Sequence, residues 1–451
     1  MEKKIPVKTL YLLFVISFGL IALGIVSTYA VFTASAEIQN PIAFTTNLSY
    51  SGDIIETKEV KVPAGEIVTV TLDIVNDSNS TLNYVSWYTT DSEKVSVVYN
   101  TMDLYYIEST SELDLPQGTI ESGMHKTFNI DIRNNDKHVV TVTIGASSSS
   151  ESIVLDSKMK ELPYPAYAVY SGDDNSLTFY KTGDTIIWQE IYNGKSVDAI
   201  YTNVETSTDK NWDASSYEII SIEDTISPIS TVRWFASIMC ESIDLTNLDT
   251  SNVKDMSGMF ELAGNSVETF EIIGLDTWDT SNVENMSYMF SGAGAEVTEW
   301  NLDLSSWDTS SVTDMSYMFS QTAQYATEWN LNLSGWDTSS VTDMTEMFIN
   351  SGGEAEGTFN IIGLDDWDTR NVESMYSMFE NSGYYKEEWN IGDISKWDTG
   401  SVRRIWWMFG NAGLNADYHL DLSNWDVSNV EDYGSFAEGV EDKIDEPTWP
   451  E

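Results

Sequence analysis

The chain has 451 residues, of which 41% are hydrophobic, so it is long and apolar enough to bury a sizeable core. Acidic residues outnumber basic residues by 72 to 22, and the resulting net charge of −50 makes nucleic acid and anionic lipid surfaces poor partners. The single cysteine, Cys240, excludes an intrachain disulfide, and its thiol is expected to be buried and inert.

Residues 1–36 have the pattern of an export signal. Lys3, Lys4 and Lys8 precede an uncharged stretch, residues 9–36, that ends in Ala34-Ser35-Ala36. A basic start, an apolar stretch and small residues at its end are typical of a cleaved secretory signal peptide, and the stretch is also long enough for an uncleaved membrane anchor. Either alternative predicts that the rest of the chain is exported to the cell surface or the extracellular space, and that the membrane is contacted only through this segment.

Residues 37–146 are predicted to form an antiparallel β-sandwich domain. Apolar and polar residues alternate in residues 68–74, 128–132 and 140–144, which is the pattern of half-buried strands. The sequence GIVSTYAVFTASAEI followed by such strands resembles the start of TasA- and camelysin-type exported proteins, and that resemblance implies a role in an extracellular fibre or matrix. The Ser-rich residues 147–162 predict a flexible linker, and residues 163–247 are expected to cap the next domain.

Residues 248–440 contain seven copies of one phrase, in which Trp-Asp and a Thr/Ser/Asn cluster precede Val-x-x-Met-x-x-Met-Phe. The Asp of the phrase recurs every 28 to 31 residues, at Asp249, Asp279, Asp308, Asp337, Asp368, Asp398 and Asp426. Such a period indicates stacked units that bury their apolar faces against one another. Residues 441–451, which follow the last copy, are predicted to form a C-terminal tail.

Each unit is predicted to contain one short strand and one short helix. Val283, Met286, Met289 and Phe290 have the spacing of one helical face, and the alternation in residues 300–304 indicates a strand. The apolar stripe is expected to be core, and the repeated Asp is expected to be a turn or capping residue rather than a metal ligand.

The repeats resemble those of BspA-like leucine-rich-repeat bacterial surface proteins, whose hallmark is W-D-T-S-N-V-x-x-M-x-x-M-F. The resemblance covers residues 160–440 and implies an exported protein that acts in adhesion or recognition. The predicted fold class is therefore an α+β solenoid of leucine-rich-repeat type, with a short strand and a short helix per repeat, preceded by the antiparallel β-sandwich domain.

Aromatic and basic residues outside the repeated phrase are the candidate ligand-binding residues: Arg403, Arg404, Trp406, Trp407, Tyr384 and Tyr385. Aromatic and Arg side chains are enriched at interfaces, so these residues could bind a glycan or an extracellular protein. The alternative is structural, with Trp407 filling an adjacent groove and the arginines pairing with nearby carboxylates.

No catalytic motif or metal-ligand spacing is found among the three histidines, so an enzyme is not expected. No cofactor is expected either, although the acidic surface could hold calcium loosely. Two functions remain open. The first is non-catalytic adhesion or recognition through the repeats, and the second is a structural subunit that self-associates into a fibre or matrix through the β-sandwich domain.

Overall fold

The computed structural model of the chain describes residues 42–48, 57–100, 116–149, 155, 157–181, 191–202, 204–208, 210, 212 and 217–450. The predicted signal peptide or anchor, residues 1–36, lies outside them. None of the helical segments in the described residues is long and apolar enough to cross a membrane.

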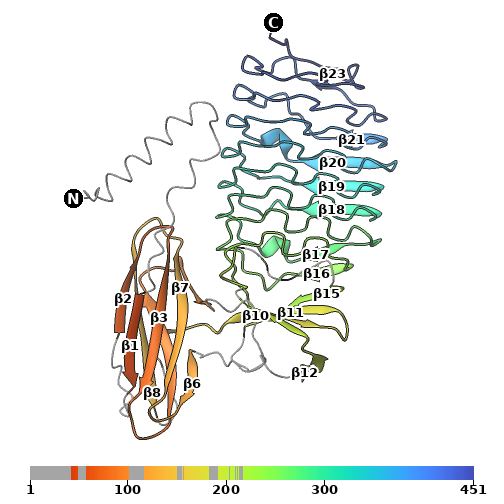
Figure 1. Cartoon of the computed structure of the whole chain (residues 1–451). Helices are drawn as coiled ribbons and strands as arrows, with labels where there is room; N and C mark the ends of the chain where they lie inside the picture. Colours follow the sequence, from red (N-terminus) through yellow and green to blue (C-terminus); the bar gives the residue numbers. More distant parts are fainter. Residues whose placement is uncertain are drawn as a thin grey trace, which may run out of the picture. The chain divides into compact units, whose positions relative to one another are not determined.

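The N-terminal part consists of two sheets (Figure 1), in which strands β2 to β8 pair antiparallel. One sheet has the order β1-β3-β7-β5, formed by Ile42–Leu48, Ile67–Asn76, His125–Asn134 and Val95–Asn100. The other has the order β2-β8-β4-β6, formed by Thr57–Val62, Val140–Ser149, Leu82–Thr90 and Gln117–Ile120. The alternating apolar residues explain the pairing, because Val70 and Leu72 lie opposite Ile130 and Phe128 and all four are buried.

The flexible linker predicted from residue 147 onward is wrong for its first three residues. Ser147, Ser148 and Ser149 are the end of β8 and pair with β4. Trp87 Nε1 also donates a hydrogen bond to Ser147 Oγ at 3.0 Å, and β9 (Lys160–Glu161) pairs with β4 further along. These serines are held by a sheet ladder and by a buried indole, which a composition of small polar residues does not reveal.

The capping segment and the first repeats share a six-stranded sheet of order β14-β10-β11-β15-β16-β17. Its antiparallel end consists of β14 (Ala199–Tyr201), β10 (Ala166–Ser171) and β11 (Ser176–Lys181). From β11 onward the strands are parallel: β15 (Ile219–Ile222), β16 (Ser242–Asp244) and β17 (Glu271–Ile273). A small hairpin, β12 (Ile191–Tyr192) and β13 (Lys195–Ser196), lies within the capping segment.

The central repeats contribute one strand each to a second parallel sheet, of order β18-β19-β20-β21. The strands are Glu299–Asp303, Glu328–Asn332, Thr358–Ile362 and Glu388–Asn390, and Figure 1 shows them one above another. Trp300, Trp329 and Phe359 occupy the same register position, so equivalent residues of successive repeats lie side by side. The last pair is β22 (Leu420–Asp421) with β23 (Ile444–Asp445).

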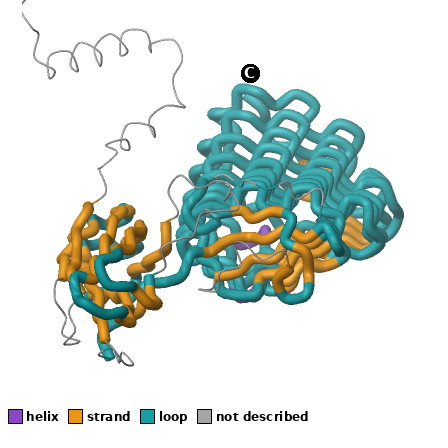
Figure 2. The backbone as a smooth tube through the Cα atoms, turned by 60° about the horizontal axis from the view of Figure 1, so that its bottom comes forward, coloured by secondary structure: helices purple, strands orange, loops and turns teal. Residues whose placement is uncertain are grey.

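The predicted α+β solenoid of leucine-rich-repeat type is wrong, because the described residues contain strands, turns and short 3-10 segments but no α-helix. The expected helix at residues 283–290 is a series of turns, and Figure 2 shows that most of the repeat region is loops and turns. The N–H groups of Met286, Tyr288 and Phe290 donate to the carbonyls of the next repeat, and Tyr288 has a φ of 58°. A helix would need those N–H groups for bonds within the segment, and left-handed residues interrupt it.

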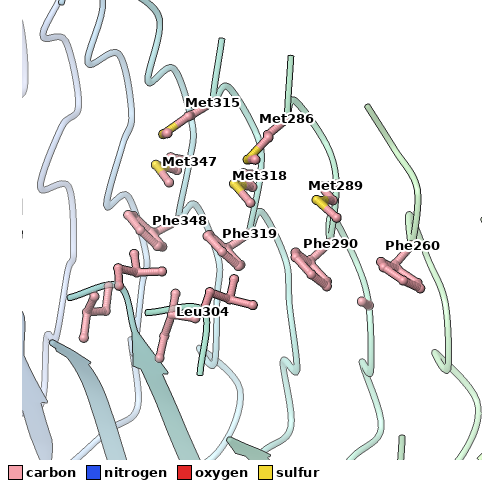
Figure 3. Packing of buried hydrophobic residues seen from close by; sticks show 14 of the residues in the cluster. Phe260, Met286, Met289, Phe290, Leu304, Met315, Met318, Phe319, Met347 and Phe348 are labelled. Atoms are coloured by element: carbon pink, nitrogen blue, oxygen red, sulfur yellow. The ribbon is translucent and has the colours of Figure 1, made fainter. Parts of the chain in front are cut away.

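The apolar stripe is core, as predicted. Phe290, Phe319, Phe348 and Phe379 are fully buried and stack on one another, with ring centroids 5.5, 5.6 and 5.3 Å apart. The methionines of the phrase form parallel buried columns beside them (Figure 3). The same spacing of apolar residues therefore packs as turns instead of helix. Cys240 is also buried, and burial raises the pKa of its thiol to about 11.

Polar residues of the phrase tie each repeat to the next. The buried Thr hydroxyls donate across the interface; Thr280 Oγ1, for example, donates to the carbonyl of Asp308 at 2.9 Å. The repeated Asp is a turn residue, as predicted, because Asp279 Oδ1 accepts hydrogen bonds from the backbone N–H and the hydroxyl of Ser281. The Trp indoles donate between repeats as well, from Trp307 to the carbonyl of Leu275 at 2.9 Å. We call residues 226–450 the repeat stack.

Two repeats carry an extra glycine at the end of their strand. Gly274 and Gly363 have φ values of 96° and 105° and precede the 3-10 segments η4 (Leu275–Thr277) and η5 (Leu364–Asp366). A Cβ at Gly363 would lie 2.6 Å from the backbone nitrogen of Ser334, and one at Gly274 would lie 2.7 Å from that of Thr246. Both the backbone conformation and the close approach require glycine there.

The C-terminal tail packs against the last repeat. Trp449 stacks on Tyr433 with ring centroids 4.7 Å apart and contacts Phe436 edge-on. Lys443 Nζ donates to the carbonyl of Leu414 at 2.8 Å, which holds the tail to the preceding coil. Tyr433 and Phe436 replace the methionines of the phrase, so this repeat presents aromatic rings to the tail that covers it.

Candidate functional site

The structure separates the six predicted binding residues into two groups. Trp406 and Trp407 contact each other edge-on, with ring centroids 5.8 Å apart, and both are partly exposed. Arg403 precedes them and pairs with Glu431 of the next repeat at 3.7 Å, with both side chains largely exposed. An exposed pair at that distance contributes little to stability.

Arg404 occupies a column of residues that pair backbone to backbone through the whole repeat stack. Its neighbours in that column are Ser374 on one side and Asp432 on the other, and the column continues through Asp343, Asp314 and Asn285. The exposed side chain of Arg404 therefore places a positive charge where most other repeats have an acidic or amide residue.

Tyr384 and Tyr385 form the second group. Their rings meet edge-on at 4.7 Å and line a shallow cavity of about 240 Å³ together with Asn381 and Glu354. They lie five and six residues after the Phe of their repeat, whereas Trp406 and Trp407 directly precede the Met-Phe of theirs. The two groups therefore come from different turns of the coil.

The structure places Trp406 and Trp407 in a row of five aromatic residues, of which one is exposed and four are partly exposed. The three tyrosines of this row were not among the predicted binding residues. Tyr288 and Tyr317, from adjacent repeats, stack with ring centroids 4.4 Å apart and an angle of 5° between the planes. Tyr317 donates its hydroxyl proton to Glu346 Oε1 at 3.0 Å in the following repeat. Two repeats further on, Tyr376 contacts Trp406 with centroids 5.4 Å apart. We call Tyr288, Tyr317, Tyr376, Trp406 and Trp407 the aromatic row.

The backbone holds part of the aromatic row in a conformation that bulky residues rarely adopt. Tyr288, Tyr317 and Trp407 belong to one column of the phrase, which is left-handed in eight successive coils with φ between 49° and 60°. The column consists of Arg233, Gly258, Tyr288, Tyr317, Glu346, Ser377, Trp407 and Ser435. Glycine is the residue favoured at such a position, so a large aromatic ring there costs about 1 kcal/mol or more.

Carboxylates surround the aromatic row and give it a negative potential. Burial and the neighbouring Glu346 raise the pKa of Tyr288, Tyr317 and Tyr376 above that of ordinary tyrosine. Burial, with the adjacent charge of Glu346, also raises the pKa of Glu380. Asp314 follows the same rule, because burial and its neighbours in the column raise its pKa. With their pKa values raised, the three tyrosines stay neutral at physiological pH.

Glycines make room for the two tryptophans. A Cβ at Gly434 would lie 2.6 Å from Trp406 Nε1, and one at Gly410 would collide with the ring of Trp407. Trp407 therefore covers Gly410 in its own repeat, while Trp406 lies over the exposed Gly434 of the next repeat. Trp406 is thus the partly exposed end of the row.

The sequence did contain a signal for the aromatic row. Tyr288, Tyr317 and Trp407 stand at one variable position of the phrase, and Tyr376 and Trp406 stand at the position before it. Comparing variable positions across the seven copies would have shown aromatics concentrated on one face. Among the described residues, no group of His, Cys, Asp and Glu side chains is arranged to hold a metal ion. Calcium binding stays a prediction.

Comparison with known proteins covers the repeats alone. No curated protein and no solved structure matches the chain. Residues 229–356 and 353–443 match the family described as "Mycoplasma protein of unknown function, DUF285", so the repeat stack is similar to the repeats of that family. This match begins within the capping segment, where Ser230 already pairs with Asp255 in the column that runs through the repeats.

Proposed function

We propose that this chain is an exported, non-catalytic bacterial surface protein that recognises an extracellular glycan or protein through its repeat stack. The aromatic row is the observation that carries the proposal. Tyr288 remains 40% exposed although it occupies a left-handed backbone position and stacks on Tyr317. Stability alone does not favour a large exposed ring at such a position, whereas a binding surface does.

Two features of the sequence support export and a surface role. Residues 1–36 have the pattern of a secretory signal or membrane anchor, and the repeats resemble those of BspA-like surface proteins. The family match is compatible with that resemblance. The large negative charge fits a protein that must remain dissolved outside the cell.

The competing function is a fibre or matrix subunit that assembles through the antiparallel sheets. Such assembly needs a sheet edge that accepts another chain. β2 is an edge strand of its sheet, and it exposes Lys58, Glu59 and Lys61. Charged side chains on an edge strand oppose pairing with a second copy, so the edge at β2 favours recognition over assembly.

The test is a binding screen of the purified full-length chain against immobilised glycans and extracellular proteins, combined with its mass in solution. We expect selective retention on some members of the screen and a mass that does not change with protein concentration. Retention on no member, with growth into filaments, would instead support the structural subunit. Protease treatment of intact expressing cells checks export, because exported repeats are digested and internal repeats are protected.

A further inference from the structure

The aromatic row together with Glu346 forms a surface to which five successive repeats contribute. Successive repeats contribute Tyr288, Tyr317, Glu346, Tyr376 and Trp406. Adjacent repeats are joined by parallel strand pairing, so they lie roughly 5 Å apart and the row extends for roughly 20 Å. A ligand that contacts all of it must therefore be an extended chain with a short repeat of its own.

The chemistry of the row alternates apolar rings with hydrogen-bond acceptors. Tyr and Trp side chains offer an apolar surface with a polar tip. The partly exposed Glu346 carboxylate lies between two pairs of rings, and its Oε1 accepts a hydrogen bond from Tyr317. The ligand hydroxyl is therefore assigned to Oε2. Sugars have this complementary character, since their C–H faces pack on aromatic rings and their hydroxyls donate to carboxylates.

The charge around the row selects against acidic ligands. Glu261, Glu346 and Glu380 all lie close enough to perturb its tyrosines. A uronate, sialate or phosphate group would be repelled there. A basic peptide would have to displace Arg233, which already pairs with Glu261 at 2.6 Å. A neutral, hydroxyl-rich chain meets neither difficulty.

The row is also rigid before any ligand arrives. The near-parallel stack of Tyr288 on Tyr317 and the hydrogen bond to Glu346 fix both rings, and the repeat backbone fixes their spacing. Little side-chain entropy is then lost on binding, which favours the weak individual contacts that a sugar makes.

We propose that the aromatic row binds a linear neutral glycan lying along the axis of the repeat stack, with sugar faces packed on the Tyr and Trp rings and hydroxyls donating to Glu346. This inference rests on the proposed recognition function and names its ligand class. It keeps Trp406 and Trp407 of the sequence-based hypothesis, but it replaces the other four predicted residues, Arg403, Arg404, Tyr384 and Tyr385, with Glu346 and the three tyrosines of the row.

The repeats themselves supply substitutions that the fold tolerates. Gly258 occupies the column of Tyr288 and Tyr317, so the double variant Tyr288→Gly/Tyr317→Gly removes two rings and relieves the left-handed backbone. Ser287 and Ser316 occupy the column of Tyr376 and Trp406, so Tyr376→Ser/Trp406→Ser is the second double variant. Tyr325→Ala is the matched control, because Tyr325 is 48% exposed and lies outside the row.

The probes are an array of linear neutral glycans built from hexoses and N-acetylhexosamines, a uronate polysaccharide, and polylysine. We expect the full-length wild type and Tyr325→Ala to bind the same neutral glycans independently of salt, and each double variant to bind them at least about tenfold more weakly. Thermal unfolding of every variant confirms that the fold is retained.

Three results would overturn the inference. The first is equal glycan binding by the double variants and the wild type. The second is retention only on polylysine or only on the uronate polymer, which would make charge the determinant. The third is binding to an extracellular protein but to no neutral glycan, which would leave the proposed recognition function intact. Binding to no glycan and no protein would contradict both proposals together.

Discussion

Two neighbouring repeats, one regular and one with an extra glycine, show what holds the repeat stack together. In the regular repeat, Trp336 Nε1 donates to the carbonyl of Leu304 in the preceding repeat at 2.9 Å. In the next repeat, Gly363 is inserted, and the buried Trp367 Nε1 has no hydrogen-bond partner among the residues that the structure describes. Both indoles still stack on one another, with centroids 6.3 Å apart.

The other repeat with an inserted glycine also lacks the hydrogen bond of its indole N–H. Trp278 follows Gly274, and its buried Nε1 also lacks a partner within the described part of the chain. In contrast, the indoles of three other repeats donate to a carbonyl of the preceding repeat: Trp307, Trp397 and Trp425. The inserted glycine therefore brings the backbone against the neighbouring peptide and costs the indole its acceptor. Ring stacking tolerates an insertion that the hydrogen bond does not.

The largest expected effect is that of a side chain at the inserted glycine. Gly363→Ala would place a Cβ 2.6 Å from the nitrogen of Ser334 at a φ of 105°, so we expect a loss of about 3 kcal/mol or more in the free energy of unfolding. Gly335→Ala is the control, since its φ is 84° but its nearest neighbour would be 3.7 Å away, and it should cost only about 1 kcal/mol. Denaturant unfolding measures both. Equal losses would show that backbone conformation, and not the close approach, makes Gly363 necessary.

The same repeat contains a buried lysine. Lys386 is fully buried, donates to the carbonyl of Ala326, and stands where other repeats have the buried Val297 or Ala416. The repeat before it has one extra residue in this loop, ending at Gly357, which approaches the Thr327 backbone so closely that a Cβ would collide with it. Burial lowers the pKa of Lys386 from about 10.5 to about 8.

This shift predicts a pH dependence of stability. Between pH 8 and about 10.5 the unfolded chain binds a proton that the folded chain does not, so Lys386 makes stability rise with pH through that window. Below pH 8 the buried charge costs a constant amount of about 3 kcal/mol. Lys386→Met removes this cost and loses one hydrogen bond, so we expect a net gain of about 2 kcal/mol at pH 7.

The measurement is the difference in unfolding free energy between wild type and Lys386→Met from pH 7 to pH 11. That difference should fall by about 3 kcal/mol as the pH rises from 8 to 10.5, so that Lys386→Met becomes the less stable chain at high pH. Lys396→Met, which changes an exposed lysine of the same repeat, should leave the pH dependence unaltered. Parallel curves for the wild type and Lys386→Met would mean that Lys386 keeps an ordinary pKa in the folded chain.

The comparison of repeats also shows why sequence patterns predicted some features and missed others. The period, the buried Met and Phe columns and the turn role of Asp279 were predictable, because each depends on a residue type that recurs in every copy. The helix at residues 283–290 was wrong because apolar spacing of three and four also fits successive turns. The deciding information, that alternate N–H groups bond to the next repeat, is not local.

The candidate site was harder to predict for a related reason. Arg403, Arg404, Trp406 and Trp407 attracted attention because they are unusual within one repeat. The aromatic row becomes apparent only when the same variable position is compared between repeats, because Tyr288 and Tyr317 are each unremarkable within their own repeat. The left-handed backbone that makes their presence informative is visible only in the structure.

The smallest expected effect tests the comparison directly. Trp336→Phe and Trp367→Phe remove equivalent, almost fully buried indoles, but only Trp336→Phe leaves a carbonyl, that of Leu304, without its donor. We expect Trp336→Phe to be the more destabilising of the two by about 1 kcal/mol, since the loss of ring area is shared. Thermal and denaturant unfolding of both variants give the difference. If the two variants lose the same stability, ring packing alone holds these repeats together and the hydrogen bond that Gly363 disrupts contributes nothing measurable. If Trp367→Phe is the milder change, the insertion of Gly363 has already removed the stabilising indole hydrogen bond that Trp336 still makes. The loop that begins at Gly363 is then retained for a reason other than stability.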